Sequence, residues 1–415
     1  MSLLCGSHGG VSIFQHPGCD KRKFRLEVIQ MFIFLLLFLS IYGAAHAYLL
    51  LRLRWAFPNM RAWWPVAIGW CLLMMAAPIA TRLLERAGYI ASATAVAWGG
   101  YLWMGCLFLF IAISLVLELL RLLRWLALFF VSIASPPLLS PRPFFITCFC
   151  SAMLITWYGY FEASQLIVEQ TAVTTTKLPK GSKPLRIVQI SDLHIGLLVC
   201  SPQVQQLVTQ IQQLQPDLVV ATGDIVDGHI CHFDGVSQLF RSLQPRLGMF
   251  AVLGNHEYYA GAEPSRAFLE NAGFRILQGQ AAQVTDQLVV AGVDDPAATR
   301  FKLQPQGDEQ LLLRSIPADR FVLLLKHRPV IEPASTGRFD LQLSGHVHKG
   351  QIFPFNLLTW LAFPVRAGMN QLADGSLLYV NRGPGTWGPP IRFLAPPELT
   401  VIDLIPTEGH EKTRP

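Results

Sequence analysis

Charged residues are scarce in this chain, and their scarcity is uneven. Of the 415 residues, only 14% are Asp, Glu, Lys or Arg, whereas 52% are hydrophobic. Soluble globular domains carry roughly 25% charged residues, so the composition excludes a wholly soluble protein. The apolar excess lies before about residue 162, and we therefore expect the first part of the chain to lie in lipid.

Dense clusters of Lys and Arg are also lacking in the second half, where basic residues are interleaved with acidic ones. Surfaces that bind nucleic acid are built from clustered basic residues with aromatic residues among them. We interpret the formal net charge of +6 as a solvated surface, and we expect no nucleic-acid partner.

The eight cysteines do not form a disulfide framework. Cys5 and Cys19 lie in the N-terminal tail, and only Cys200 and Cys231 lie in the hydrophilic half. One bridge between that pair would say little about the cellular compartment. The others lie in apolar runs, where a thiol is usually a small hydrophobic group: Cys71, Cys106, Cys148 and Cys150.

Four apolar runs in the first half are long enough to cross a bilayer as helices, which takes about 20 residues. They are 28–51, 63–81, 93–119 and 143–161. Trp63 and Trp157 lie near the ends of such runs, where an aromatic belt would form. Ala45-His46-Ala47 resembles a signal-peptidase site, but the late start of the first run and the further runs behind it favour an uncleaved anchor.

A shorter apolar run covers 125–135 and ends in Pro136-Pro137. We interpret it as an interfacial or re-entrant piece, which leaves four spans; counting it as a span gives five. With four spans, the N-terminal tail and the second half share a side, and the basic run Lys21-Arg22-Lys23 favours the cytoplasm for both. With five spans, the second half would be extracytoplasmic.

The sequence divides into five parts. Residues 1–25 form a polar tail, 26–162 the membrane helical region, 163–184 a polar connector, 185–405 a more hydrophilic domain and 406–415 a C-terminal tail. Within 185–405, short strands alternate with amphipathic helical stretches, which is typical of a layered α/β domain. The predicted strands are 185–190, 217–222, 249–253, 287–292, 321–326, 341–344, 377–381 and 398–404, and a helix is predicted over 203–215.

Five short motifs in this domain carry groups that bind metal ions, and each follows an apolar run. They are Asp192-Leu193-His194, Gly223-Asp224, Gly254-Asn255-His256-Glu257, His327, and Gly345-His346-Val347-His348. Each alone is a weak signal, because a single Asp or His after a strand is usually structural. Carboxylate, amide and imidazole ligands following five strands in this order indicate a dinuclear metal site. Asp227, just beyond Asp224, we interpret as a turn or supporting residue.

With these motifs in this order, residues 185–405 resemble the calcineurin-like metallophosphoesterase superfamily. The whole layout is similar to the transmembrane metallophosphoesterases, which have an N-terminal membrane region. Four stretches are similar to that subgroup: Gly254 to Tyr259, Gly292 to Asp295, Gly350 to Pro354, and Gly383 to Gly388. The resemblance implies a four-layer αββα sandwich that follows an α-helical membrane domain of about four spans.

The resemblance also implies a role for each residue of the motifs. Two divalent metal ions (Mn, Fe or Zn) would be bound, one by Asp192, His194 and His348 and the other by Asn255, His327 and His346, with Asp224 bridging them. His256 would face the phosphate and either stabilise charge or protonate the leaving group. Lys349 stands where the family usually has a second glycine, and it could contact the substrate phosphate.

The implied activity is hydrolysis of a phosphodiester or pyrophosphate bond by metal-activated hydroxide. The apolar stretch 353–363 has two interpretations: a cap packed on the sheet, or a surface that includes Trp360 and enters the bilayer beside the metals. The second favours a lipid-linked phosphoester substrate and contact with membrane lipid. The alternatives are a UDP-2,3-diacylglucosamine pyrophosphohydrolase of lipid A synthesis, a nuclease, and a non-catalytic metal-binding scaffold or sensor.

Overall fold

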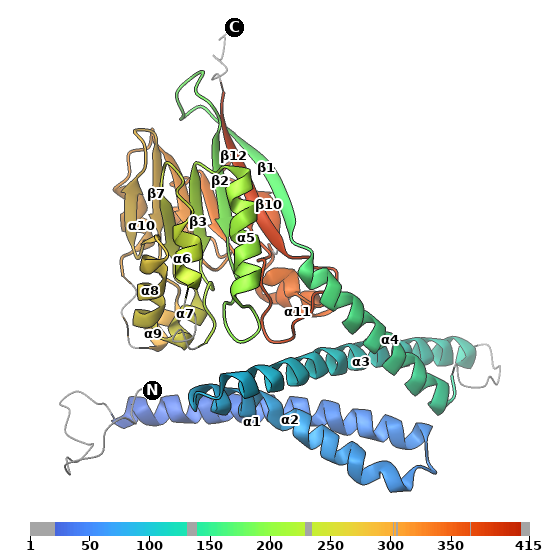
Figure 1. Ribbon diagram of the computed structural model, residues 1–415. Coiled ribbons are helices and arrows are strands. Elements are labelled where there is room, and N and C mark those ends of the chain that lie inside the picture. The colour runs from blue at the N-terminus through green and yellow to red at the C-terminus, as the bar shows by residue number, and fades with distance from the viewer. Residues whose placement is uncertain are drawn as a thin grey trace, which may run out of the picture.

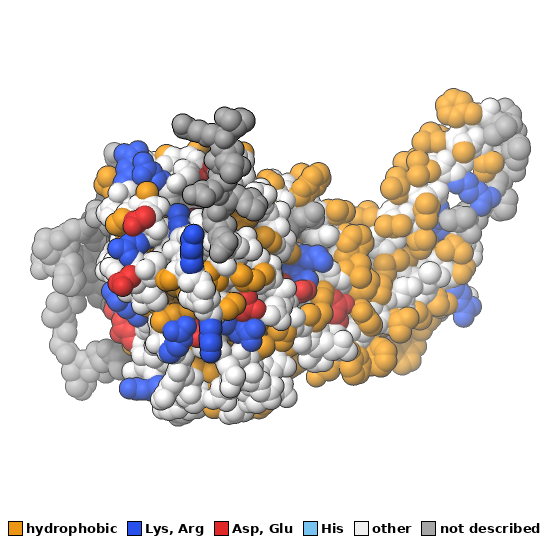
Figure 2. All heavy atoms as spheres, turned by 90° about the horizontal axis from the view of Figure 1, so that it is seen from above, with side chains coloured by type: hydrophobic (Ala, Val, Ile, Leu, Met, Phe, Trp, Pro, Cys, Tyr) orange, Lys and Arg blue, Asp and Glu red, His pale blue; other side chains and the backbone are white. Residues whose placement is uncertain are grey.

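Four long helices form the N-terminal region of the computed structural model, which describes residues 21–130, 139–228, 235–301, 303, 306–365 and 367–407. They are α1 (Lys21–Ala56), α2 (Trp64–Arg86), α3 (Ile90–Phe130) and α4 (Pro141–Ser164). Each is long and apolar enough to cross a membrane. Together they form an arm beside the sheets (Figure 1), and hydrophobic side chains cover this arm (Figure 2). The predicted helical membrane region with four spans is confirmed.

The third helix is longer than its apolar run predicted. Residues 125–130 continue α3 without a break to Phe130, so the interpretation of this segment as a separate interfacial or re-entrant piece is wrong for these residues. The stretch from Leu115 to Leu128 is rich in Leu and Arg, which favour helix, and it contains no proline or glycine. Residues 131–135 lie outside the described residues.

Two six-stranded sheets form the C-terminal region, in the orders β1-β12-β2-β3-β4-β5 and β10-β11-β9-β8-β7-β6. All eight predicted strands are present, and no end differs by more than two residues. The strands are β1 (Ile167–Thr175), β2 (Leu185–Ile190), β3 (Leu218–Thr222), β4 (Met249–Val252), β5 (Arg275–Ile276), β6 (Gln280–Gln283), β7 (Leu288–Gly292), β8 (Phe321–Leu325), β9 (Leu341–Ser344), β10 (Gly368–Gln371), β11 (Leu377–Val380) and β12 (Glu398–Pro406).

The two sheets pack face to face, with helices outside. Ile187, Val220 and Leu323 belong to one buried core that joins the inner faces of both sheets. On the outer face of the first sheet lie α5 (Ser201–Leu214), α6 (Val236–Arg241) and α8 (Ala262–Asn271), and α10 (Glu309–Arg314) covers the second sheet. The central strands run parallel and are buried on both faces, which explains their unbroken apolar runs. The predicted four-layer αββα sandwich is confirmed.

The connector predicted at 163–184 contains a strand that the sequence analysis missed. β1 pairs in parallel with β12 along its whole length, from Ile167 opposite Glu398 to Thr175 opposite Pro406. It is an edge strand, and Val173 is its one buried residue, so its sequence lacks the apolar signal of an inner strand. Only Gln165 and Leu166 separate β1 from the end of α4.

The membrane helices contact the sheet domain at glycines. A Cβ atom on Gly105 of α3 would lie 2.8 Å from Ile391 Cδ1, and one on Gly159 of α4 would lie 2.7 Å from the backbone oxygen of Arg392. The backbone N–H of Arg392 also donates to the Gly159 oxygen, at 2.9 Å. The buried carboxylate of Glu162 accepts hydrogen bonds from backbone N–H groups of residues 394 and 395, at 3.2 and 2.9 Å. The domain is therefore docked on the bundle by backbone contacts.

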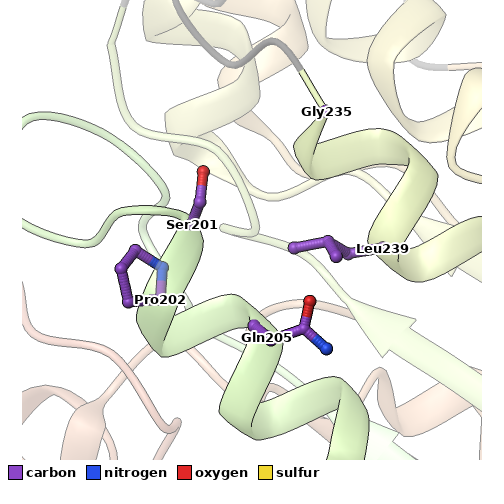
Figure 3. A pocket seen from close by; sticks show the side chains of 5 residues that line it. All are labelled: Ser201, Pro202, Gln205, Gly235 and Leu239. Atoms are coloured by element: carbon purple, nitrogen blue, oxygen red, sulfur yellow. The ribbon is translucent and has the colours of Figure 1, made fainter.

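A groove of about 390 Å³ opens on the outer helical face, between α5 and α6 (Figure 3). Its lining residues are Ser201, Pro202, Gln205, Gly235 and Leu239. They include no titratable side chain and none of the predicted metal ligands, so this groove is not the site that the motifs predict.

Replacing Gly159 by Ala tests the docking of α4. The added Cβ has no room beside the Arg392 oxygen, and we expect a loss of about 1–3 kcal/mol in unfolding free energy, as in overpacked cores. Thermal unfolding of the detergent-solubilised protein measures it. Gly99→Ala in α3 is the matched control, because nothing lies within 4 Å of its added Cβ. Equal melting temperatures for the two variants would contradict the tight contact.

Candidate metal centre

The seven predicted ligands follow the carboxyl ends of strands in both sheets. Asp192 and His194 follow β2, Asp224 follows β3, Asn255 follows β4, His327 follows β8, and His346 and His348 follow β9. Parallel strands end at the same edge of a sheet, which is where ligands bind in α/β folds. All seven are buried except His346, which is half-buried. The packing of the two sheets brings these two edges together.

One cluster consists of Asp192, His194 and His348, whose donor atoms all lie within 4.8 Å of one another. The Nε2 atoms of His194 and His348 are 3.0 Å apart, and Asp192 Oδ1 lies 3.4 Å from His348 Nε2. Two ligands of one cation, with bonds of about 2.0–2.2 Å, are separated by about 3.0–3.4 Å. These three residues therefore fit a divalent cation.

A second cluster surrounds His327 Nε2. This atom lies 3.2 Å from Asp224 Oδ2, 3.2 Å from Asn255 Oδ1 and 3.1 Å from His346 Nδ1. The separations again match those of ligands around one cation. The two clusters contain the two ligand sets that the sequence resemblance implied, and their mixed nitrogen and oxygen donors suit a borderline divalent cation.

Unusual backbone conformations aim these side chains. Five of the seven have positive φ angles: Asp192 (50°), His194 (53°), Asp224 (53°), His346 (74°) and His348 (46°). This region costs a non-glycine residue roughly 1–2 kcal/mol, and it persists only where the surroundings enforce it. Here the backbone N–H of His194 donates to the Asp224 oxygen at 3.0 Å, and that of His346 donates to the Asp192 carboxylate at 2.9 Å.

Two of the motif positions require glycine because atoms of neighbouring loops lie too close for a side chain. A Cβ atom on Gly254 would lie 2.2 Å from Asp224 Oδ1, and one on Gly345 would lie 1.9 Å from Ser191 Oγ. Both distances are far inside van der Waals contact, so any side chain at either position would push a ligand strand aside. The glycines before Asn255 and His346 therefore permit the two edges to meet.

Burial keeps three of the histidines neutral. It lowers the pKa of His194 to about 4 and that of His346 to about 3, and it lowers the pKa of His348 well below its usual value. A neutral imidazole has a lone pair to offer a cation. His327 differs: burial opposes its protonation, but the Asp224 carboxylate raises its pKa to about 10. A cation bound at His327 must therefore displace a proton.

His256 has a partner that the sequence analysis did not assign to it. Its Nδ1 lies 3.1 Å from Asp227 Oδ1. Burial opposes protonation of His256, but Asp224 and Asp227 raise its pKa to about 9. Asp227 follows Asp224 by three residues, and this spacing on a strand-end loop is the one signal that could have identified it.

Glu257 anchors the two loops that carry Asp224 and Asn255. Its buried carboxylate accepts hydrogen bonds from the backbone N–H groups of residues 224, 225, 226 and 254, at 2.9, 2.6, 3.0 and 2.8 Å. The spacing from Gly254 to Glu257 is that of a helix capping box, which opens α7 (Asn255–Ala260). Glu257 lies within one of the five motifs, but no role was predicted for it.

Two further predicted residues lie outside the clusters. Lys349 follows His348 in a tight turn with a φ of 52° and is half-buried. Trp360 is 53% exposed on α11 (Phe355–Ala362). Neither belongs to a group of donors that could hold a metal ion, so their predicted contact with substrate remains a prediction.

The sheet domain is similar in sequence to known proteins. Residues 185–350 match the family model described as calcineurin-like phosphoesterase. An uncharacterised metallophosphoesterase of Aquifex aeolicus is 40% identical over 255 residues, which are 61% of this chain and 97% of the relative. The chain belongs to the metallophosphoesterase family. It is therefore a metal-dependent phosphoesterase, a hydrolase of ester bonds.

A second relative and a solved structure are also similar to this chain. A Danio rerio protein described as a transmembrane protein with metallophosphoesterase domain is 32% identical to this metallophosphoesterase, over 60% of this chain and 59% of the relative. Among solved structures, a dimetal phosphatase from Danio rerio covers 49% of this chain and 88% of its own, with 14% identity and a TM-score of 0.34. With its four membrane-length helices, this metallophosphoesterase is a membrane protein.

Metal binding should release a proton from His327. At pH 7.5 the raised pKa keeps this imidazole protonated, and a cation needs its lone pair, so we expect Mn to displace about one proton. Affinity for Mn should therefore fall as pH falls. Calorimetric titration in two buffers of different ionisation enthalpy measures the release, with His327→Asn as the control that lacks it. Heats independent of the buffer would contradict this assignment.

Asp227 should set the alkaline limit of activity. A raised pKa keeps His256 protonated at neutral pH, and the protonated form is lost as pH rises through that pKa. Asp227→Asn removes the carboxylate that raises the pKa, so the alkaline fall of kcat/KM should move to lower pH. The pH profile of phenyl phosphate hydrolysis measures it, because phenolate needs a proton to leave, with the exposed Asp319→Asn as control. A shift to higher pH, or none, would refute the role.

Proposed function

We propose that this metallophosphoesterase cleaves a phosphodiester or pyrophosphate bond in a lipid-linked substrate at the membrane surface. Two divalent cations would be held by the seven ligands, with Asp192, His194 and His348 at one, Asn255, His327 and His346 at the other, and Asp224 between them. The observation that carries the lipid-linked substrate is the position of α11, an apolar helix at the end of the sheet domain that faces the membrane helices (Figure 1).

Both ends of α11 are tied to the ligand clusters. The helix begins seven residues after His348, and Phe363, which follows it, lies against His346 with ring centroids 5.2 Å apart. Between these points Leu357, Leu358 and Leu361 are 54%, 58% and 78% exposed. Such a contiguous apolar surface on a soluble domain is typical of a lipid or partner contact.

The contact between α11 and α3 supports a position of this surface close to lipid. The rings of Phe355 and Phe108 have centroids 6.3 Å apart. α3 carries no charged residue from Ile90 to Leu117, and Phe108 precedes its first charge, Glu118, by ten residues or about 15 Å of helix. That distance is about half of the roughly 30 Å hydrocarbon core. A lipid-linked substrate could therefore keep its chains in the bilayer beside α11.

The chemistry follows from the residues around the two clusters. When bound, the cations would lower the pKa of a coordinated water and neutralise phosphoryl charge. His256, held by Asp227, would donate a hydrogen bond or a proton to the leaving oxygen. Lys349, next to His348, would contact the phosphate, and Trp360 would contact the lipid portion. Mixed nitrogen and oxygen ligation suits Mn, Fe or Zn.

We further propose that the catalytic domain faces the cytoplasm. The end of α2 lies against the catalytic domain, with Arg82 3.5 Å from Asp227. Two spans, α1 and α2, separate the end of α2 from the start of α1 at Lys21-Arg22-Lys23. Both of these helix ends therefore lie on the same side of the membrane. Basic residues beside membrane spans favour the cytoplasmic side, and limited proteolysis of oriented vesicles tests this placement.

Substrate preference tests the proposed function. Replacing Trp360 and Leu361 together by Asp should reduce hydrolysis of a lipid-linked phosphodiester or of UDP-2,3-diacylglucosamine by about 10-fold or more, because each charge opposes insertion into lipid. Turnover of bis-p-nitrophenyl phosphate should stay within about twofold of the parent. Activities of the purified protein with Mn and with a chelator give the comparison.

Two control variants sharpen the test. Leu311→Asp adds a charge at an exposed position on α10, 66% exposed, and should alter neither activity. Asp224→Ala should abolish all metal-dependent hydrolysis. Equal loss of activity on lipid-linked and soluble esters in the Trp360 and Leu361 variant would contradict a lipid-linked substrate. Metal binding by the parent without turnover of any ester would favour the non-catalytic scaffold.

A further inference from the structure

The second membrane helix ends against the residue that holds His256. Arg82 Nη2 lies 3.5 Å from Asp227 Oδ1, the same oxygen that lies 3.1 Å from His256 Nδ1. Arg82 Nη1 lies 3.0 Å from Glu85 Oε2, one helical turn further along α2. A continuous row of polar contacts therefore leads from α2 to the imidazole beside the metal clusters.

The end of α2 lies close to the loop after β3, and this packing holds Arg82 and Asp227 in place. The side chain of Glu85 is only 4% exposed. A Cβ atom on Gly228 would lie 2.6 Å from Glu85 Oε1, and Gly228 has a φ of 117°, where other residues are strained. Since Gly228 directly follows Asp227, the loop that presents Asp227 is packed on the membrane helix rather than on the sheet domain alone.

We propose that Arg82 is a positioning residue for catalysis, which holds Asp227 so that Asp227 can orient the imidazole of His256 towards the leaving group. The guanidinium suits this task because its planar fork offers separate N–H groups to Glu85 and to Asp227. The membrane bundle thereby supplies part of the catalytic centre. The inference rests on the proposed role of His256, and it does not require the substrate to be lipid-linked.

Replacing Arg82 should change the turnover rate rather than the folding stability. Arg82 is 46% exposed, and ion pairs with an exposed member contribute little to folding. If the leaving group takes its proton from His256 as the P–O bond breaks, a misaligned imidazole matters most for an ester with a poor leaving group. p-Nitrophenolate leaves readily without a proton, whereas phenolate does not.

The experiment uses the full-length protein with Mn and compares phenyl phosphate with p-nitrophenyl phosphate. In Arg82→Gln, kcat for phenyl phosphate should fall by about 10- to 100-fold, part of what a general acid contributes. KM should change by less than about twofold, and p-nitrophenyl phosphate should lose much less. Arg82→Lys should recover part of the loss, because it restores the positive charge beside Asp227.

Two further variants separate positioning from a general effect. Arg86→Gln removes the same charge from the same helix end, at an exposed residue, and should match the parent. Arg82→Gln combined with Asp227→Asn should be no slower than Asp227→Asn alone, since the two residues act through one path. Equal losses on both esters, an effect confined to KM, or additive losses in the double variant would overturn the proposal.

Failure of this inference can be told from failure of the proposed function. Metal-dependent turnover by the parent that is unchanged in Arg82→Gln would overturn the positioning role and leave the phosphohydrolase intact. Absence of metal-dependent turnover of these monoesters and of bis-p-nitrophenyl phosphate in the parent would overturn both.

Discussion

The convergence of buried nitrogen and oxygen donors at one edge of two sheets is the constraint on which the rest of this structure depends. Donors that approach to 3.0–3.4 Å are tolerable in a buried setting when a cation shares them. The parallel strands supply the common edge, the glycines at 254 and 345 allow the backbones to meet, and the positive φ angles turn the side chains inward. Even the neutral state of most of the histidines follows from the same burial.

The sequence predicted the inner part of the catalytic domain well, for a physical reason. Strands such as β3 and β8 are buried on both faces, so their apolar runs are unbroken and the polar ligands stand out where the runs end. β1 has one buried residue, and its pairing with a strand more than 200 positions away leaves no local trace. The end of α3 was missed because a membrane helix continues past its apolar part when the residues still favour helix.

The site was predicted less completely than the fold around it. Residues with intrinsic metal affinity could be recognised singly, but supporting residues are defined by their partners. Glu257 matters through four backbone groups on two loops, and Arg82 matters through its contact with Asp227. Arg392 is fully buried and reaches from the Gly159 oxygen to within 3.3 Å of His348 Nδ1. Nothing in its local sequence distinguishes it from a surface arginine.

The junction between α4 and β1 limits where this active site can go. Two residues, Gln165 and Leu166, join the last membrane helix to the sheet, and two extended residues reach at most about 7 Å. Leu166 is itself packed against the core of the first sheet. The site therefore cannot sweep a volume of solvent on a flexible tether. It searches a plane by lateral diffusion, so its encounters with any membrane-borne ester depend on the density of that ester per unit of bilayer area and not on bulk concentration.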